Sequence, residues 1–426
     1  MPSHSRILVV TSHPPLPANT GGRQRSSNLL RALARIMPTD LVLVHDPERL
    51  DRAVCQQLSD EFNMVACLAP TPRAGHGAWS GLRAIAPRAA DRLAHNLGRR
   101  SFDYSADPAI AEPVRALLDT GRYAAAVGRY LIPAAKASIT GQVPTILDID
   151  DLDTSVYRSR LKAPNAGCFE RAVLRHHLHQ LDTIVPASLR PFNHLWVASE
   201  ADLGLVSHPS VSTLPNIPYS ADGRLPDPVP DHAGEPVVMV IGSWDHLPNI
   251  SGLNRFLNES WPRVLARVPG ARLRVVGSGL TERQRSEWSA RPNVDVVGRV
   301  ADLREAYAGC TICVSPVFDG GGTKIKVLEA LGFGRACVAT SHSHRGYERT
   351  LPAGEAVAVG FTDEQLADEC VRLLLDERAR WSMARTGNLL VHEHYSFDGF
   401  CREVAATIGR VLPLAPRRPK VAAAFA

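Results

Sequence analysis

The chain of 426 residues has little of several features that would assign it to a membrane, secreted or nucleic-acid-binding class. No stretch approaches 18 consecutive apolar residues, so we expect no membrane-spanning helix. The eight cysteines are irregularly spaced and predict no disulfide framework. Cys310 and Cys313 form a lone CxxC without a second pair, so we expect buried small side chains there and no zinc site.

Nucleic acid is also not an expected partner, because the chain has no helix-turn-helix, no zinc finger and no basic stretch with interleaved aromatics. The net charge is +5, and the arginine-rich segment 83–100 leaves two interpretations open. It is either a solvated helix or a basic face that contacts an anionic membrane or a polyanionic acceptor. The first residues, MPSHSRILVVTS, have no long apolar region, so we expect no signal peptide and a cytoplasmic protein, with peripheral contact at the inner face of the membrane as an option.

Short apolar runs alternate with helical patterns along most of the chain. RILVVTS, DLVLVHD, VVMVIGS and VDVVGRV are typical of strands buried on both faces, whereas SSNLLRALARI has apolar residues at helical spacing. This alternation predicts an α/β protein with parallel sheets. It stops in a stretch crowded with Pro, Gly and Asp, which indicates a linker, and then restarts.

We therefore predict two Rossmann-like, doubly wound parallel-sheet domains that face a cleft. The first domain spans 1–214, the linker 215–235 and the second domain 236–395. A helix at 396–412 is expected to return to the first domain, and 413–426 form a tail. Ligands of such folds bind outside the carboxyl ends of the strands, so we expect a ligand in the cleft.

The most informative segment is FDGGGTKIKVLEALGFG, at 318–334, where three glycines lie between a predicted strand and a predicted helix. The strand is expected to end near Val317 and the helix to begin near Thr323. Glycine lets a ligand approach the backbone, and the free N–H groups of a helix start attract an anion. The glycines are Gly320, Gly321 and Gly322.

Charged side chains follow these glycines. Lys324 and Lys326 add positive charge at the helix start, and the carboxylate of Glu329 is placed to accept hydrogen bonds from a ribose diol. This pattern predicts a phosphate or diphosphate site, with a simple tight turn and solvated lysines as the alternative. The chain has neither GxGxxG after its first strand nor GxxxxGK[ST], so dinucleotide and P-loop interpretations are not supported.

The segment GGGTKIKVLEALGFGRACVAT resembles the donor-binding signature of family 4 glycosyltransferases, which have the GT-B fold, in a GGGTK-type subgroup. Other segments resemble the same family in the same order. PPLPANTGGRQRSSNLLRAL is similar to its N-terminal glycine loop and first helix, and LDIDDLDTS to its acidic segment. LPNIP is similar to its hinge, and HYSFDGFCREVAATIGRVL to its returning C-terminal helix.

The resemblance implies a retaining glycosyltransferase of hexosyltransferase type that uses a nucleotide-diphospho-sugar and needs no metal or other cofactor. The expected acceptor is a glycan or lipid-linked intermediate of cell-envelope or exopolysaccharide synthesis. Two alternatives on the same fold stay open, a nucleotide-sugar epimerase or hydrolase, and a nucleotide-sugar-binding protein without catalysis.

The resemblance also implies roles for single residues. Lys324 and Lys326 stabilise the leaving diphosphate, and Glu329 holds the ribose. Arg25 is expected to reach a phosphate, with a surface position as the alternative. The remaining implied donor-binding residues are Gly21, Gly22, Gly242, Ser243, Gly320, Gly321, Gly322 and Thr323.

Polar residues at predicted strand ends in the first half are candidates for the acceptor side. Arg129 and Asp151 join Lys324 and Lys326 in the predicted catalytic group, and His13 is a further cleft candidate. The acidic run around Asp151 has three open interpretations: acceptor contact or an active-site wall, loop capping, or a metal site.

Two departures from the family pattern affect the expected donor site, the first at the contact to the transferred sugar and the second at the phosphates. Many members carry Glu eight residues before the position of Glu329, where this chain has Gly321. Many also carry Arg and Lys in the loop after the first strand of the second domain, where this chain has Ser243 and Asn249. We therefore expect the two lysines after the glycines to supply the positive charge.

Overall fold

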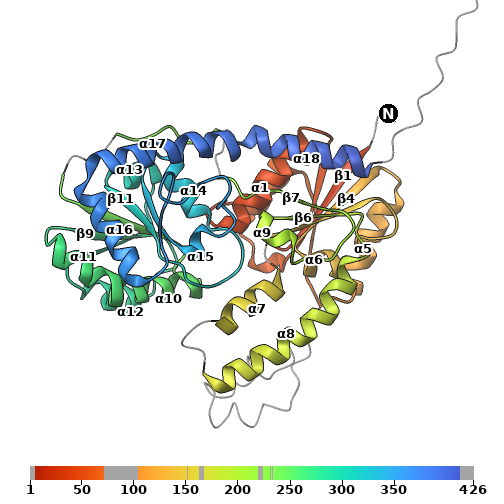
Figure 1. Cartoon of the computed structure of the whole chain (residues 1–426). Helices are drawn as coiled ribbons and strands as arrows, with labels where there is room; N and C mark the ends of the chain where they lie inside the picture. Colours follow the sequence, from red (N-terminus) through yellow and green to blue (C-terminus); the bar gives the residue numbers. More distant parts are fainter. Residues whose placement is uncertain are drawn as a thin grey trace, which may run out of the picture.

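The chain folds into two parallel β-sheets covered by helices, as the computed structural model in Figure 1 shows. The first sheet has the strand order β3-β2-β1-β4-β5-β6-β7, and the second β10-β9-β8-β11-β12-β13. The predicted α/β class with two doubly wound parallel-sheet domains is confirmed. The structure describes residues 5–71, 104–150, 152–162, 167–218, 224–230, 232 and 234–412.

The seven strands of the first sheet are all parallel, and their order reverses between β1 and β4. The apolar runs of the sequence form the central strands, and β2 is buried at every residue. In such a sheet the reversal marks the place where ligands bind. The strands are β1 (Arg6–Thr11), β2 (Thr39–Val44), β3 (Met64–Leu68), β4 (Tyr123–Arg129), β5 (Thr145–Ile149), β6 (His194–Val197) and β7 (Val211–Thr213).

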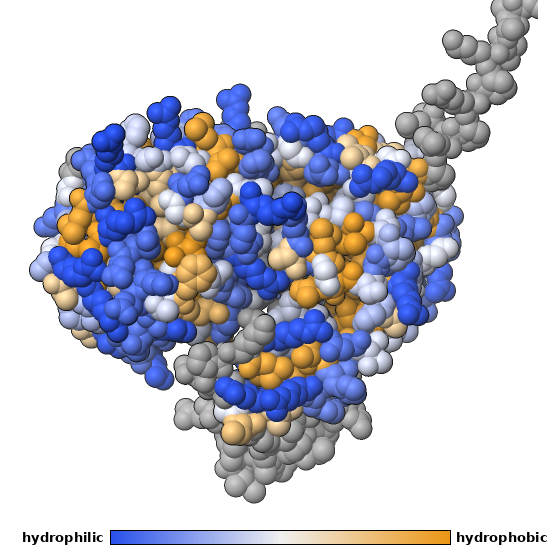
Figure 2. All heavy atoms as spheres, viewed as in Figure 1, coloured by the Kyte–Doolittle hydropathy of each residue, from blue (hydrophilic) through white to orange (hydrophobic). Residues whose placement is uncertain are grey.

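Helices cover both faces of this sheet. Two of them, α7 and α8, pack against each other and project below the sheets in Figure 1. Figure 2 shows apolar side chains gathered on this projection. The helices are α1 (Gly21–Ala34), α2 (Arg52–Phe62), α5 (Pro108–Asp119), α6 (Leu131–Lys136), α7 (Asp153–Lys162), α8 (Cys168–Leu189) and α9 (Glu200–Leu203), with a 3-10 turn at Pro47–Arg49.

The second sheet repeats this plan, and its order reverses between β8 and β11. Cys310 and Cys313 are buried, with their Sγ atoms 3.7 Å apart. The strands are β8 (Val237–Ile241), β9 (Arg272–Val276), β10 (Val294–Gly298), β11 (Ile312–Ser315), β12 (Cys337–Thr340) and β13 (Ala358–Gly360). The helices are α10 (Leu247–Arg255), a π-helical turn (Phe256–Ser260), α11 (Trp261–Arg267), α12 (Glu282–Ser289), α13 (Leu303–Ala308), α14 (Ile325–Gly332), α15 (Ser341–His344), α16 (Asp363–Leu375) and α17 (Glu377–His394).

The last helix, α18 (Phe397–Val411), leaves the second domain and packs against α1 of the first (Figure 1). Phe400, Val404 and Ile408 are buried at helical spacing along one side of α18. The indole Nε1 of Trp196 donates a hydrogen bond to Thr407 Oγ1 at 3.1 Å. The helix therefore contacts both the sheet and a helix of the first domain.

Within the described part of the chain, no helix combines the length and apolar character needed to cross a membrane. Segment 83–100 and the tail 413–426 lie outside the described residues, so the basic-face and tail predictions are not placed. The boundaries predicted at 214 and 235 stay predictions.

Candidate active site

The glycine-rich segment forms the loop between β11 and α14, at the carboxyl edge of the second sheet. Gly320 and Gly322 have φ values of +101° and +60°, a region that favours glycine. The ammonium of Lys324 folds back and donates hydrogen bonds to the carbonyls of Gly321 and Gly322, the second at 3.0 Å. The loop therefore holds one of its lysines directly over its own backbone.

Lys326 lies on the first turn of α14 and faces the loop that follows β8. Its Nζ donates to Asn249 Oδ1 at 2.7 Å, and Asn249 Nδ2 donates to the Ser243 carbonyl at 3.0 Å. A Cβ on Gly242 would lie 3.5 Å from Lys326 Nζ. Burial and the Lys324 ammonium lower the pKa of Lys326 to about 7. The two lysines thus concentrate positive charge where an anion would relieve their repulsion.

The N-terminal ends of α1 and α14 face each other across the domain boundary. A Cβ on Gly21 would lie 3.7 Å from Ile325 Cγ2, and Gln24 Nε2 donates to Glu329 Oε1 at 3.3 Å. Burial raises the pKa of the half-buried Glu329. Neither helix has a side-chain cap on its first turn. Two helix N-termini, each with the positive end of its dipole, therefore meet at the cleft.

A buried charge network lies behind this interface in the first domain. Arg25 is 2% exposed and donates from Nε to Asp148 at 3.0 Å and from its NH1 group to the Leu214 carbonyl at 2.8 Å. Arg129 is fully buried and pairs with Asp148 at 3.2 Å and Asp150 at 2.9 Å. Burial alone would raise the pKa of Asp150, but Arg129 and then Arg25 hold it at about 2. Both arginines are thus engaged in ion pairs inside the domain.

Asn216 connects this network to the second domain. Its Oδ1 accepts a hydrogen bond from Arg25 at 3.1 Å, and its Nδ2 donates to Asp150 at 2.8 Å and to Thr323 Oγ1 at 3.0 Å. One side chain thus joins the segment after β7 to the first domain and to the glycine-rich loop. Asn216 was not predictable as a site residue, because no local sequence pattern signals a contact with a residue 107 positions away.

Tyr130 forms a strained turn immediately after β4. Its φ of +67° is unusual for a residue with a side chain and costs conformational energy. Residues with such strained backbone conformations cluster at functional sites. Its ring lies over the guanidinium of Arg129, with a centroid distance of 3.9 Å, and 4.7 Å from the ring of His13. A Cβ on Gly22 would come within 2.8 Å of the Tyr130 hydroxyl. Only glycine therefore lets the start of α1 approach Tyr130 this closely.

Residues 235–376 match the model of a family described as Glycosyl transferases group 1. This match covers the second domain as far as the end of α16 and includes the glycine-rich loop and α14. No curated protein sequence matches the chain.

Solved structures resemble both domains together. Sucrose-phosphate synthase from Thermosynechococcus elongatus superposes with a TM-score of 0.63 and 18% identity, over 95% of this chain and 98% of its own. The chain has the GT-B fold. A mutant of TarM from S. aureus, solved with fondaparinux, α-GlcNAc-glycerol and UDP, has a TM-score of 0.64 and 11% identity over 95% of this chain and 99% of its own. HepE from Anabaena, solved with UDP-glucose, has a TM-score of 0.59 and 13% identity over 96% of this chain and all of its own.

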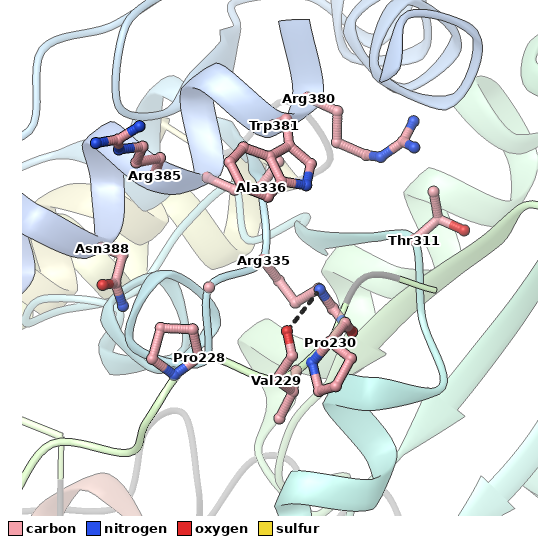
Figure 3. Close-up of a pocket in the computed structure, with 12 residues that line it drawn as sticks. Pro228, Val229, Pro230, Thr311, Arg335, Ala336, Arg380, Trp381, Arg385 and Asn388 are labelled. Atoms are coloured by element: carbon pink, nitrogen blue, oxygen red, sulfur yellow. Dashed lines mark hydrogen bonds between the residues drawn. The ribbon is translucent and has the colours of Figure 1, made fainter. Parts of the chain in front are cut away.

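In this GT-B protein a cavity of about 380 Å³ lies away from the cleft (Figure 3). It is lined by Thr311 and Ala336, which precede β11 and β12, and by side chains of α17. Figure 3 shows Arg335 reaching the carbonyl of Val229 in the segment between the domains. The cavity lies at the amino ends of β11 and β12, whereas the glycine-rich loop follows the carboxyl end of β11. This cavity is therefore not part of the candidate site.

Two further expectations from the sequence concern Asp151 and a metal ion. Asp151 lies outside the described residues, so the structure does not place it. Among the residues that are described, no group of three His, Cys, Asp or Glu side chains is arranged to hold a metal ion. A reaction without metal stays a prediction.

Proposed function

We propose that the protein is a retaining, family 4-type glycosyltransferase that moves a hexosyl group from a nucleotide-diphospho-sugar to a glycan or lipid-linked acceptor. The observation that carries this proposal is the meeting of two uncapped helix N-termini and two lysines at the cleft. A diphosphate there interacts with both helix dipoles and with the ammonium groups of Lys324 and Lys326. In this proposal the lysines supply the positive charge, and the reaction needs no metal or other cofactor.

The comparisons support a nucleotide sugar as the donor. The second domain matches a glycosyltransferase family model, and HepE was solved with UDP-glucose. We place the diphosphate between the glycine-rich loop and the loop at Gly242 and Ser243, and the ribose at Glu329. Gly21 and Gly22 close over the donor from the first domain.

The transfer balances without an additional reactant. The acceptor hydroxyl oxygen forms a bond to the anomeric carbon while the bond from that carbon to the diphosphate breaks. The electron pair leaves with the diphosphate, and a nucleoside diphosphate and a proton are released. Because negative charge grows on the diphosphate during this step, the lysines and the backbone N–H groups stabilise the transition state more than the bound donor.

The acceptor belongs on the first domain, where Tyr130 and His13 lie beside the start of α1. We propose cell-envelope or exopolysaccharide synthesis as the setting, in the cytoplasm or at the inner face of a membrane. Arg129 acts in this proposal as a positioning residue, because it orients Tyr130 and Asp150 from inside the domain.

The first test is the shift in thermal unfolding caused by UDP-, GDP-, ADP- and TDP-sugars without added metal. Ligand at about 100 times its Kd stabilises the fold by about 2.7 kcal/mol. Lys324→Ala and Glu329→Ala should weaken the shift, whereas Arg267→Ala, which removes an exposed ion pair with Asp368 between α11 and α16, should not. Absence of a shift with every nucleotide sugar would contradict the proposal.

Measurements of turnover then distinguish the three interpretations, which are a transferase, a hydrolase or epimerase, and a binding protein without catalysis. A transferase releases nucleoside diphosphate faster when acceptor is added, and the anomeric configuration of the product reports retention. A hydrolase or epimerase consumes donor at the same rate without acceptor. A binding protein gives the thermal shift but no turnover.

A further inference from the structure

The first domain contains a cavity of about 200 Å³ beside the cleft. Its walls come from residues that follow the carboxyl ends of three neighbouring strands, His13 after β1, Ile132 after β4 and Leu152 after β5. The outer wall comes from α8, which packs near α6 (Figure 1). The cavity therefore opens at the same edge of the sheet as the candidate active site.

The cavity is lined mainly by aliphatic side chains. Ile132 is 49% exposed, whereas the other aliphatic side chains are buried or nearly so. The carboxylate of Asp153, which also lines the cavity, already accepts a hydrogen bond from the Tyr104 hydroxyl at 2.9 Å. The wall of the cavity therefore presents mainly hydrocarbon surface to a ligand. Its other aliphatic members are Leu131, Pro133, Ile149, Leu152, Val185 and Leu189.

The cavity shares Tyr130 and His13 with the cleft. The Tyr130 hydroxyl lies 3.4 Å from Asp150 Oδ2 and 3.1 Å from the nearest Arg129 nitrogen. A Cβ on Gly22 would lie 2.8 Å from that hydroxyl and 4.0 Å from His13 Cδ2. One end of the cavity is therefore next to the glycine pair that we place over the donor.

We propose that the acceptor is an amphiphile whose hydrocarbon part fills this cavity and whose hydroxylated headgroup lies at Tyr130 and Asp150. The inference rests on the proposed function and names the acceptor class for the same site. A wholly polar glycan would leave the aliphatic wall in contact with water, whereas a hydrocarbon chain removes that surface from water. Apolar side chains also gather on the projection of α7 and α8 (Figure 2), and Val185 and Leu189 of α8 belong to the cavity wall.

The test uses alkyl β-glucosides with methyl, butyl, hexyl and octyl chains as probes, measured by calorimetry below their micellar concentrations. UDP is titrated into the same samples. Affinity should rise about fourfold for each methylene that enters the cavity and level off once the cavity is full. UDP affinity should stay constant across the series.

Two variants give the matched comparison. Ile132→Asp puts a charge on the exposed part of the wall and should weaken octyl glucoside binding at least about tenfold while leaving UDP affinity unchanged. Leu205→Asp changes an apolar residue of similar exposure, 40%, that does not line the cavity, and should have no effect.

The possible outcomes separate the two proposals. If UDP binds but affinity does not depend on chain length, or if the two variants behave alike, the amphiphilic acceptor is overturned and the donor site stands. If neither UDP nor any other nucleotide binds the wild-type protein, the proposed function is overturned, and the acceptor inference is overturned with it.

Discussion

At the residue scale, the pKa of Lys326 makes one charge of the site depend on pH near neutrality. In the free protein the side chain is an ammonium below about pH 7 and increasingly a neutral amine above it. A bound diphosphate stabilises the ammonium and raises that pKa. Affinity for a nucleotide sugar should therefore be full below pH 7 and fall about tenfold per pH unit above it. Calorimetry with UDP-glucose measures this, because its esterified diphosphate, unlike a terminal phosphate, has no ionisation near pH 6.

Substitutions at the two lysines identify the group that titrates. Lys326→Met should lower affinity about 10- to 100-fold and make the pH profile flat, because it removes a charged hydrogen-bond donor. Lys324→Ala removes the like charge that helps to lower the pKa of Lys326, so the decline in nucleotide-sugar affinity should begin at higher pH. A flat wild-type profile, or a slope that persists in Lys326→Met, would assign the titration elsewhere.

Glu329 tests where the ribose lies. In the proposed site the Glu329 carboxylate accepts hydrogen bonds from the ribose diol. It also accepts the hydrogen bond from Gln24. Glu329→Ala should weaken UDP binding about tenfold more than it changes the binding of inorganic diphosphate, because diphosphate has no ribose. Competition binding of both ligands checks this. An equal loss for both would place the carboxylate at the phosphates or in the fold.

Single residues are predictable from the sequence where their chemistry is local. The three glycines and the two lysines are nearly consecutive, so the sequence places them in one loop. Arg25 and Asp148 are 123 residues apart, and no pattern indicates that they pair. The sequence therefore led us to expect a phosphate contact for Arg25, while the structure shows it buried against an aspartate.

At the element scale, α18 follows the second domain in the chain and packs against the first. Phe400 is 2% exposed and lies in the apolar cluster that includes residues of α1. Phe400→Ala should lower the free energy of unfolding by about 3–5 kcal/mol, through lost burial and the cavity that remains. Urea unfolding measures this. Glu403→Ala, on the exposed side of the same helix, should change the free energy of unfolding by less than about 0.5 kcal/mol. Equal effects of the two substitutions would show that α18 is only loosely attached.

The elements themselves were largely predictable, because continuous apolar runs mark strands and helical spacing marks the segments between them. The residues at which the strands and helices end were less predictable. The strand expected to end near Val317 ends at Ser315, before Pro316, which has no N–H for a sheet hydrogen bond. The helix expected near Thr323 begins at Ile325, because Lys324 has a non-helical ψ of 87°. An apolar pattern does not encode such loop conformations.

At the scale of the whole molecule, polar contacts between the domains are of two kinds. Arg349 pairs with Glu200 at 2.6 Å, and both side chains are exposed. Such an exposed pair contributes little to stability, from about 0 to 1 kcal/mol. Arg345 pairs with the buried Asp202, also at 2.6 Å. The buried Asn216 has more effect, because removing it leaves several buried groups without a partner. The sequence predicts two domains from two series of strands and helices, but it does not encode how they meet.

Asn216→Ala tests whether this residue couples the domains. The change removes the hydrogen bonds to Asp150 and Thr323, so open arrangements should become more populated. We expect a larger radius of gyration by small-angle scattering without ligand, and nucleotide-sugar affinity lowered by about 5- to 100-fold, since closure must then be driven by the ligand. Saturating ligand should restore the wild-type radius. Arg267→Ala, which removes an exposed ion pair with Asp368 inside the second domain, should change neither quantity. If Asn216→Ala scatters and binds like the wild type, then the remaining contacts between the domains, among them α18 and the ion pairs at Asp202 and Glu200, are sufficient to hold them together.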